Sequence, residues 1–153
     1  MTVFIYSGGG AMRVYPFIPV PARAGVHGFE NPAAEYTQLG LSLDELLVQH
    51  PSATYIGLAQ GDSMQGVGIF DGDVLIVDRH VTAQQGNVIV ATLNGEFVCK
   101  IYDKTRKLLL SSNEQQQAVE VKDYDDFRIE GVVTRSVRLH THCSILVSQL
   151  CMP

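Results

Sequence analysis

The chain is poor in cysteine and contains no long hydrophobic run. Its 153 residues include only three cysteines, Cys99, Cys143 and Cys151, an odd number without the spacing of a disulfide framework. We therefore expect reduced thiols and a cytoplasmic location. The first residues lack the basic region and the adequate apolar stretch of a signal peptide. No segment approaches the roughly 20 apolar residues of a membrane span, so we expect no membrane association.

Positive charge is also scarce. The sequence has 11 Lys and Arg against 16 Asp and Glu, a net charge of -5, and its pI is near 5.4. Since no basic stripe with interleaved aromatic residues is present, we do not expect direct, sequence-specific DNA binding. What the chain does have is an apolar fraction of 46% over 153 residues. This is enough for one hydrophobic core, while the length is too short for two ordinary domains.

The N-terminal residues 1–39 are predicted to form a flexible arm. Prolines disfavour helix and leave the backbone extended or mobile, and this stretch contains Pro16, Pro19, Pro21 and Pro32. A folded domain is expected over residues 40–153. Near its start, Ser42 and Glu45 have the spacing of a capping box, which predicts a short helix to about Gln49 that stops before Pro51.

After this helix the sequence signals are nearly all β. Short segments rich in β-branched and aromatic residues alternate with turns such as Asp71-Gly72. The strand candidates are residues 54–60, 74–78, 87–93, 96–102, 107–111, 118–121 and 127–139. Many short strands with regular turns predict a mostly β fold, with folded antiparallel sheets or a small barrel and one short helix.

One serine and one lysine in this β region form a candidate catalytic pair. Ser63 follows the strand candidate 54–60, and Gly61 supplies a turn where backbone N–H groups, such as that of Met64, can face a reacting carbonyl. Lys100 interrupts an apolar run from Phe97 to Tyr102. A desolvated lysine can lose its proton and activate a serine hydroxyl. Taken singly, such a serine is more often a turn residue, and such a lysine more often extends from an edge strand into solvent.

The height of Lys100 on its strand is set by a predicted hairpin. Asn94-Gly95 is a strong signal for a two-residue turn. It would join residues 87–93 to residues 96–102. This pairing fixes where the ammonium projects from the sheet.

Several blocks of the sequence together resemble the LexA/UmuD family of self-cleaving SOS-response proteins. They are Gly61-Asp62-Ser63-Met64, residues 71–78, Gly95-Glu96-Phe97-Val98-Cys99-Lys100 and Gly131-Val132-Val133-Thr134, while residues 46–55 indicate the UmuD branch. The resemblance extends over about residues 28–134. It implies the β fold of the LexA C-terminal domain, with Ser63 as nucleophile and Lys100 as general base.

The resemblance also implies a cleavage site in the arm. Residues 28–36 match the family's arm motif and put the scissile bond between His27 and Gly28. Family members usually have alanine or cysteine before that glycine, so the histidine is a departure. Ala24-Gly25 is the alternative bond, with the expected small residue but without the phenylalanine and proline that follow Gly28.

The function implied by the resemblance is SOS mutagenesis. The trimmed protein would be a homodimer that serves as accessory subunit of an error-prone translesion DNA polymerase with a UmuC-like Y-family subunit. A RecA filament on single-stranded DNA would stimulate cleavage, and no cofactor is implied. The alternative is a cleavage-poor interaction module that regulates a polymerase as an intact dimer. Since no helix-turn-helix precedes the arm, we do not expect a repressor. Signal peptidases have a similar serine–lysine pair but need a membrane anchor, and the sequence shows no membrane span, so we do not expect a signal peptidase.

Two polar clusters are candidate metal sites, but their signals are weaker than that of the serine–lysine pair. His140, His142 and Cys143 follow the last strand candidate, where alternation would put both imidazoles on one face. The carboxylates are Asp71, Asp73, Asp78, Asp123, Asp125 and Asp126, and they lack the EF-hand spacing. We expect a polar strand end in the first case and turn residues in the second, and no metal in either.

Overall fold

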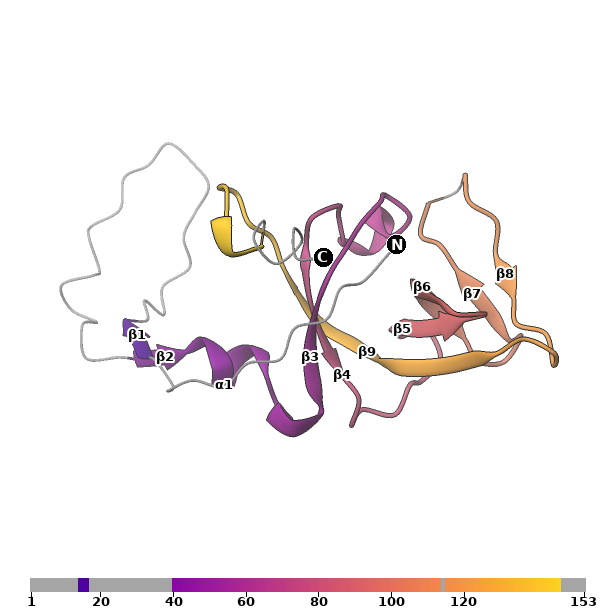
Figure 1. The fold of residues 1–153 in the computed structure, drawn as a ribbon, viewed down its shortest axis with the longest axis horizontal. Helices are drawn as coiled ribbons and strands as arrows, with labels where there is room; N and C mark the ends of the chain where they lie inside the picture. The colour runs from indigo at the N-terminus through magenta and orange to yellow at the C-terminus, as the bar shows by residue number, and fades with distance from the viewer. Residues whose placement is uncertain (1–13, 17–39, 114, 147–153) are drawn as a thin grey trace. The chain divides into compact units, whose positions relative to one another are not determined.

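A computed structural model describes residues 14–16, 40–113 and 115–146 (Figure 1). These residues fall into two compact units, the first formed by 14–16 and 40–51 and the second by the remainder. None of the helices in the described ranges is long and apolar enough to cross a membrane.

The first unit is a two-stranded sheet followed at once by a short helix. Its elements are β1 (Val14–Pro16), β2 (Gly40–Ser42) and α1 (Leu43–Leu47), and β1 pairs antiparallel with β2. The Ser42 side chain accepts the backbone N–H of Glu45 at 3.4 Å, which satisfies one donor of the first helical turn. The prediction that Ser42 caps a helix is confirmed, although α1 ends before Gln49. Neither β1 nor β2 was predicted.

The second unit is built around a seven-stranded antiparallel sheet. Its strands are β3 (Thr54–Leu58), β4 (Val74–Asp78), β5 (Val88–Leu93), β6 (Glu96–Asp103), β7 (Leu108–Leu110), β8 (Val119–Glu120) and β9 (Phe127–Val137), with 3-10 turns η2 (Pro51–Ala53) and η3 (Gln65–Val67). The order across the sheet is β3-β4-β9-β5-β6-β7-β8. The mostly β class is confirmed, and every predicted strand is present with ends within two residues of the prediction.

The long strand β9 connects the two halves of this sheet, as Figure 1 shows. Its first half pairs with β5 and its second half with β4, and the register shifts once in each pairing. Such bulges bend the strand and increase its twist. At the crossing, a Cβ on Gly131 would lie 2.8 Å from Val77 Cγ1. Glycine there allows β4 and β9 to approach closely.

The β5–β6 hairpin sets the position of Lys100. Asn94 and Gly95 have φ values of 50° and 87°, and two successive positive values are those of the two-residue turn that matches strand twist. The predicted hairpin is therefore confirmed. Its register pairs Lys100 with Ile89 of β5.

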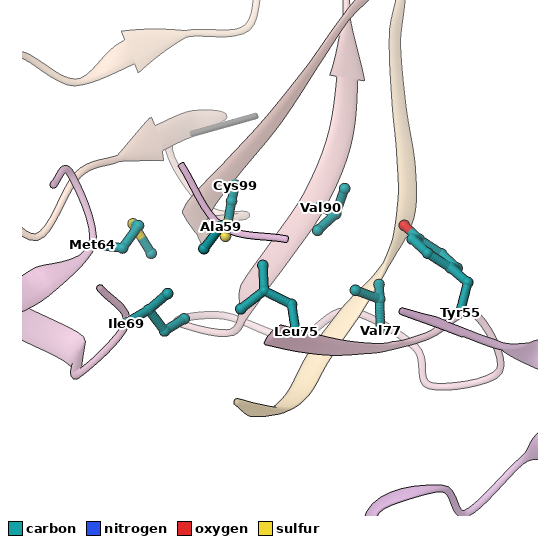
Figure 2. Packing of buried hydrophobic residues seen from close by; sticks show 8 residues of the cluster. All are labelled: Tyr55, Ala59, Met64, Ile69, Leu75, Val77, Val90 and Cys99. Carbon is teal, nitrogen blue, oxygen red and sulfur yellow. The ribbon is translucent and has the colours of Figure 1, made fainter. Parts of the chain in front are cut away.

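The larger core cluster anchors the segment after β3 (Figure 2). Its buried members are Tyr55, Ala59, Met64, Ile69, Leu75, Val77, Val90 and Cys99. Met64, Leu75 and Cys99 have no exposed surface, so they bring the turn after β3 together with β4 and β6. A second cluster contains Ile89, Ala91, Leu109 and Val132. Ser63 immediately precedes Met64, so the complete burial of Met64 helps to fix the position of Ser63.

Candidate active site

The turn after β3 holds Ser63 below the surface of the second unit. Gly61 enters the turn with φ of 95°, and its N–H donates to Asp71 Oδ1 at 2.7 Å. On the other side Met64 is completely buried. Ser63 is 4% exposed, and its Oγ has no hydrogen-bond partner among the described residues. A buried hydroxyl without a partner loses its hydration without compensation. The Tyr55 hydroxyl is in the same situation, so a catalytic role is one explanation for such an atom.

Lys100 lies on β6 and is partly buried. This burial lowers the pKa of its ammonium below the ordinary value, while neighbouring Cys99 acts in the opposite direction. Burial raises the pKa of the Cys99 thiol to about 11. The thiol is therefore neutral near pH 7 and does little to keep the lysine charged. The environment agrees with the expectation that Lys100 is poorly solvated.

The dipeptide Ser111-Ser112 links Ser63 and Lys100. Lys100 Nζ donates to Ser111 Oγ at 2.7 Å. The backbone N–H of Ser112 donates to the Ser63 carbonyl oxygen at 2.8 Å, and its hydroxyl donates to the same oxygen at 3.3 Å. The two predicted residues, 37 positions apart in sequence, thus hydrogen-bond to adjacent residues just after β7.

Ser112 also lies against the 3-10 turn that follows the candidate nucleophile. A Cβ on Gly66 would lie 2.4 Å from the Ser112 carbonyl oxygen, closer than real Cβ atoms come. Only glycine lets η3 and Ser112 approach to this degree. The contact with Gly66 and the two hydrogen bonds to the Ser63 carbonyl all tie this turn to Ser112.

A further polar side chain completes a chain of hydrogen bonds around the pair. The Ser111 hydroxyl donates to Gln116 Oε1 at 3.1 Å. Gln116 Nε2 in turn donates to Asp62 Oδ1 at 3.5 Å. Asp62 directly precedes Ser63 in the sequence. The path Lys100, Ser111, Gln116, Asp62 therefore leads back to the turn that holds Ser63.

The loop between Ser63 and β4 is fixed by a residue beyond the end of β9. Arg138 donates through Nε and Nη2 to the two carboxylate oxygens of Asp73, both at 2.8 Å. Its guanidinium carbon lies 4.0 Å from the centroid of the Phe70 ring, and Nη2 also reaches the Gly68 carbonyl at 3.0 Å. The hydrogen bonds from Arg138 lower the pKa of the buried Asp73 carboxyl. These contacts of Arg138 were not predicted from the sequence.

The structure tests neither the predicted cleavage bonds nor the predicted oxyanion donor. His27, Gly28, Ala24 and Gly25 lie outside the described residues. Met64 is described and fully buried. The role of its backbone N–H toward an oxyanion stays a prediction.

The histidine cluster and the aspartate cluster do not form a metal site within the described residues. Strand β9 ends at Val137, so His140 and His142 do not lie on one strand face as alternation predicted. Within the described ranges, no three His, Cys, Asp or Glu residues converge to hold a metal ion. The carboxylates of Asp71, Asp73, Asp78 and Asp125 accept backbone N–H groups from Gly61, Phe70, His80 and Lys122. These are the turn roles that we expected.

Comparison with known proteins shows one family over most of the chain. A family model described as peptidase S24-like matches residues 16–134. Protein MucA, from Salmonella typhimurium and from Escherichia coli, is 39% identical over 145 residues, which cover 94% of this chain and 99% of the relative. Protein SamA of Salmonella typhimurium is 37% identical over 108 residues, 70% of this chain and 75% of SamA. The LexA repressor of Syntrophotalea carbinolica is 41% identical over 80 residues, 51% of this chain and 40% of the repressor.

Proposed function

The chain belongs to the peptidase S24-like family, and we propose that it is a serine peptidase that cuts a bond in its own N-terminal arm. Ser63 is the nucleophile and Lys100 the general base. The main support is the arrangement around the dipeptide Ser111-Ser112. The Lys100 amine hydrogen-bonds to Ser111, and the Ser63 backbone carbonyl hydrogen-bonds to Ser112. The Ser63 hydroxyl itself is buried without a partner among the described residues, and partial burial lowers the Lys100 pKa. A base activates a nucleophile from within hydrogen-bond reach. Ser63 Oγ makes no hydrogen bond to Lys100 Nζ or to any other described residue in this structure, so the proposal requires the amine to approach the hydroxyl when the substrate is bound.

The chemistry requires a neutral lysine. An ordinary lysine, with a pKa of about 10.4, is neutral in roughly one molecule in a thousand near pH 7.4, and each unit of depression raises this share about tenfold. The neutral Lys100 amine takes the proton of the Ser63 hydroxyl while Ser63 Oγ bonds to the carbonyl carbon of the scissile peptide. The oxyanion accepts the Met64 N–H. Lys100 then gives its proton to the leaving amine, and water hydrolyses the ester without a metal or cofactor.

The substrate in this proposal is the arm, residues 1–39, and residues 40–153 are the peptidase domain. The favoured bond is His27–Gly28, and Ala24–Gly25 is the alternative. Both precede β2, so either cut leaves the whole peptidase domain in the larger fragment. The two bonds are distinguished by the masses of the products.

The proposed cellular role follows the family resemblance. The trimmed chain forms a cytoplasmic homodimer and serves as accessory subunit of an error-prone translesion polymerase with a UmuC-like Y-family catalytic subunit. A RecA filament on single-stranded DNA stimulates cleavage by favouring the arm conformer that reaches the active site, which is a population shift. If the filament speeds cleavage without changing hydrogen exchange in the arm, this explanation of stimulation is wrong.

The test is self-cleavage of the purified full chain, followed by intact mass. The chain is incubated at about pH 10, where a lysine base is neutral in a large share of molecules, and separately near pH 7 with RecA filament. We expect two fragments from the wild-type chain and none from Ser63→Ala or Lys100→Ala. Equal cleavage in all three would exclude the dyad. An intact wild-type mass under both conditions would favour the interaction module, which the bulky His27 before Gly28 supports.

A further inference from the structure

We propose that Ser111 is a positioning residue that aims the lone pair of the Lys100 amine at Ser63. The inference rests on the proposed function and adds a residue to it. Ser111 does not touch the substrate in this scheme. It acts by accepting one N–H of the amine, and Gln116 keeps the Ser111 hydroxyl in the orientation that permits this.

The sheet register explains why Ser111 meets Lys100. Strands β6 and β7 pair Ile101 with Leu110, Tyr102 with Leu109 and Asp103 with Leu108. Continued by one pair, this register sets residue 111 opposite Lys100. Side chains of directly opposed residues lie on the same face of an antiparallel pair. The observed distance of 2.7 Å between Lys100 Nζ and Ser111 Oγ agrees with this geometry.

Counting protons assigns the direction of each hydrogen bond. A serine hydroxyl has one proton to donate. That proton goes to Gln116 Oε1 at 3.1 Å, since an amide oxygen only accepts. Gln116 presents this oxygen because its Nε2 faces Asp62 Oδ1 at 3.5 Å, and a carboxylate only accepts. The Ser111 oxygen is therefore left as an acceptor for Lys100.

This arrangement matters once Lys100 is neutral. A neutral amine has two N–H groups and one lone pair, and rotation about its C–N bond can point the lone pair in several directions. Because the Ser111 oxygen accepts an N–H, that direction is closed to the lone pair. The base is then oriented before the reaction starts, which is the kind of alignment that contributes to rate.

The test separates orientation from structural support by measuring self-cleavage against pH. In Ser111→Ala we expect a plateau rate lower by roughly 10- to 100-fold. We also expect the inflection at lower pH, because the ammonium loses an acceptor that favours the charged form. Ser111→Thr keeps the hydroxyl and should restore most of the rate. Gln116→Ala should show a smaller loss of plateau, and the exposed Ser136→Ala on β9 is the matched control with wild-type behaviour.

A second measurement does not depend on cleavage. The Lys100 pKa is titrated by NMR in chains carrying Ser63→Ala, with and without Ser111→Ala. We expect the lower pKa in the double variant, and equal values would overturn the inference even if no cleavage occurs. If the wild-type chain cuts through Ser63 and Lys100 while Ser111→Ala has the same pH profile, the inference fails and the proposed function stands. If Ser63→Ala and Lys100→Ala cut like wild type, the proposed function itself fails.

Discussion

Replacing Gly66 by alanine should slow self-cleavage by displacing Ser63 while leaving the fold intact. The added Cβ would lie 2.4 Å from the Ser112 carbonyl oxygen, whereas real Cβ atoms stay at least 3.0 Å away, so the two segments must separate by about 0.6 Å. Ser112 holds the Ser63 carbonyl through its N–H at 2.8 Å. We therefore expect the separation to displace the turn that holds Ser63.

The expected size of the effect follows from this displacement. A misplacement of about 1 Å at a reacting group can cost about 100-fold in rate, so about 0.6 Å predicts a loss on the order of tenfold or more. Overpacking of this kind also destabilises a protein by about 1–3 kcal/mol. For a chain of this length that lowers Tm by about 2–4 °C per kcal/mol.

The assay is the self-cleavage rate at about pH 10, measured well below the Tm of every variant. Gly131→Ala is the matched control, because its Cβ would meet Val77 Cγ1 at 2.8 Å and the Asp78 carbonyl oxygen at 3.0 Å, in the sheet and not at the candidate site. We expect a comparable fall in Tm with wild-type cleavage. If both variants lose rate equally at matched stability, or if Gly66→Ala cuts like wild type, the reasoning is refuted.

Two further predictions concern titratable groups. Lys100→Met should raise Tm near neutral pH. Burial lowers the folded-state pKa of Lys100, so the unfolded chain binds the proton more tightly and the charged lysine destabilises the fold. The gain in Tm should shrink as pH rises from the folded pKa toward about 10.4. Asp73→Asn should destabilise by about 1–3 kcal/mol through loss of charge-assisted hydrogen bonds. Because Arg138 lowers the Asp73 pKa, the stabilisation by Asp73 is present above about pH 3.9 and disappears as pH falls through the folded pKa. Thermal unfolding of the two variants and the wild type from pH 2 to 10 checks both predictions. A variant whose Tm follows the wild-type curve at every pH would contradict its prediction.

The strands and the β5–β6 hairpin were predictable because their signals are local. Asn94-Gly95 requires two positive φ values, and the structure has them at 50° and 87°. Apolar runs between turn residues gave the strand positions to within two residues. The short strand Val14–Pro16 had no such signal, since three residues ending in proline do not show a strand period.

The surroundings of the candidate pair were only partly predictable. The desolvation of Lys100 follows from its apolar neighbours in sequence. Ser111 becomes visible only when the β6–β7 register is known, because its contact is across the sheet. Arg138 is 65 residues from Asp73, and a single arginine after a strand gives no sequence signal for its partner.

The most direct test of a neutral lysine base is to compare two pH curves for the same chain. One is the rate of self-cleavage, and the other is the NMR titration of Lys100 in the Ser63→Ala background. We predict a rate that rises about tenfold per pH unit and levels off at the titrated pKa of Lys100, with no cleavage in Lys100→Ala at any pH. A rate that levels off at a different pH, or that persists in Lys100→Ala, would contradict the account.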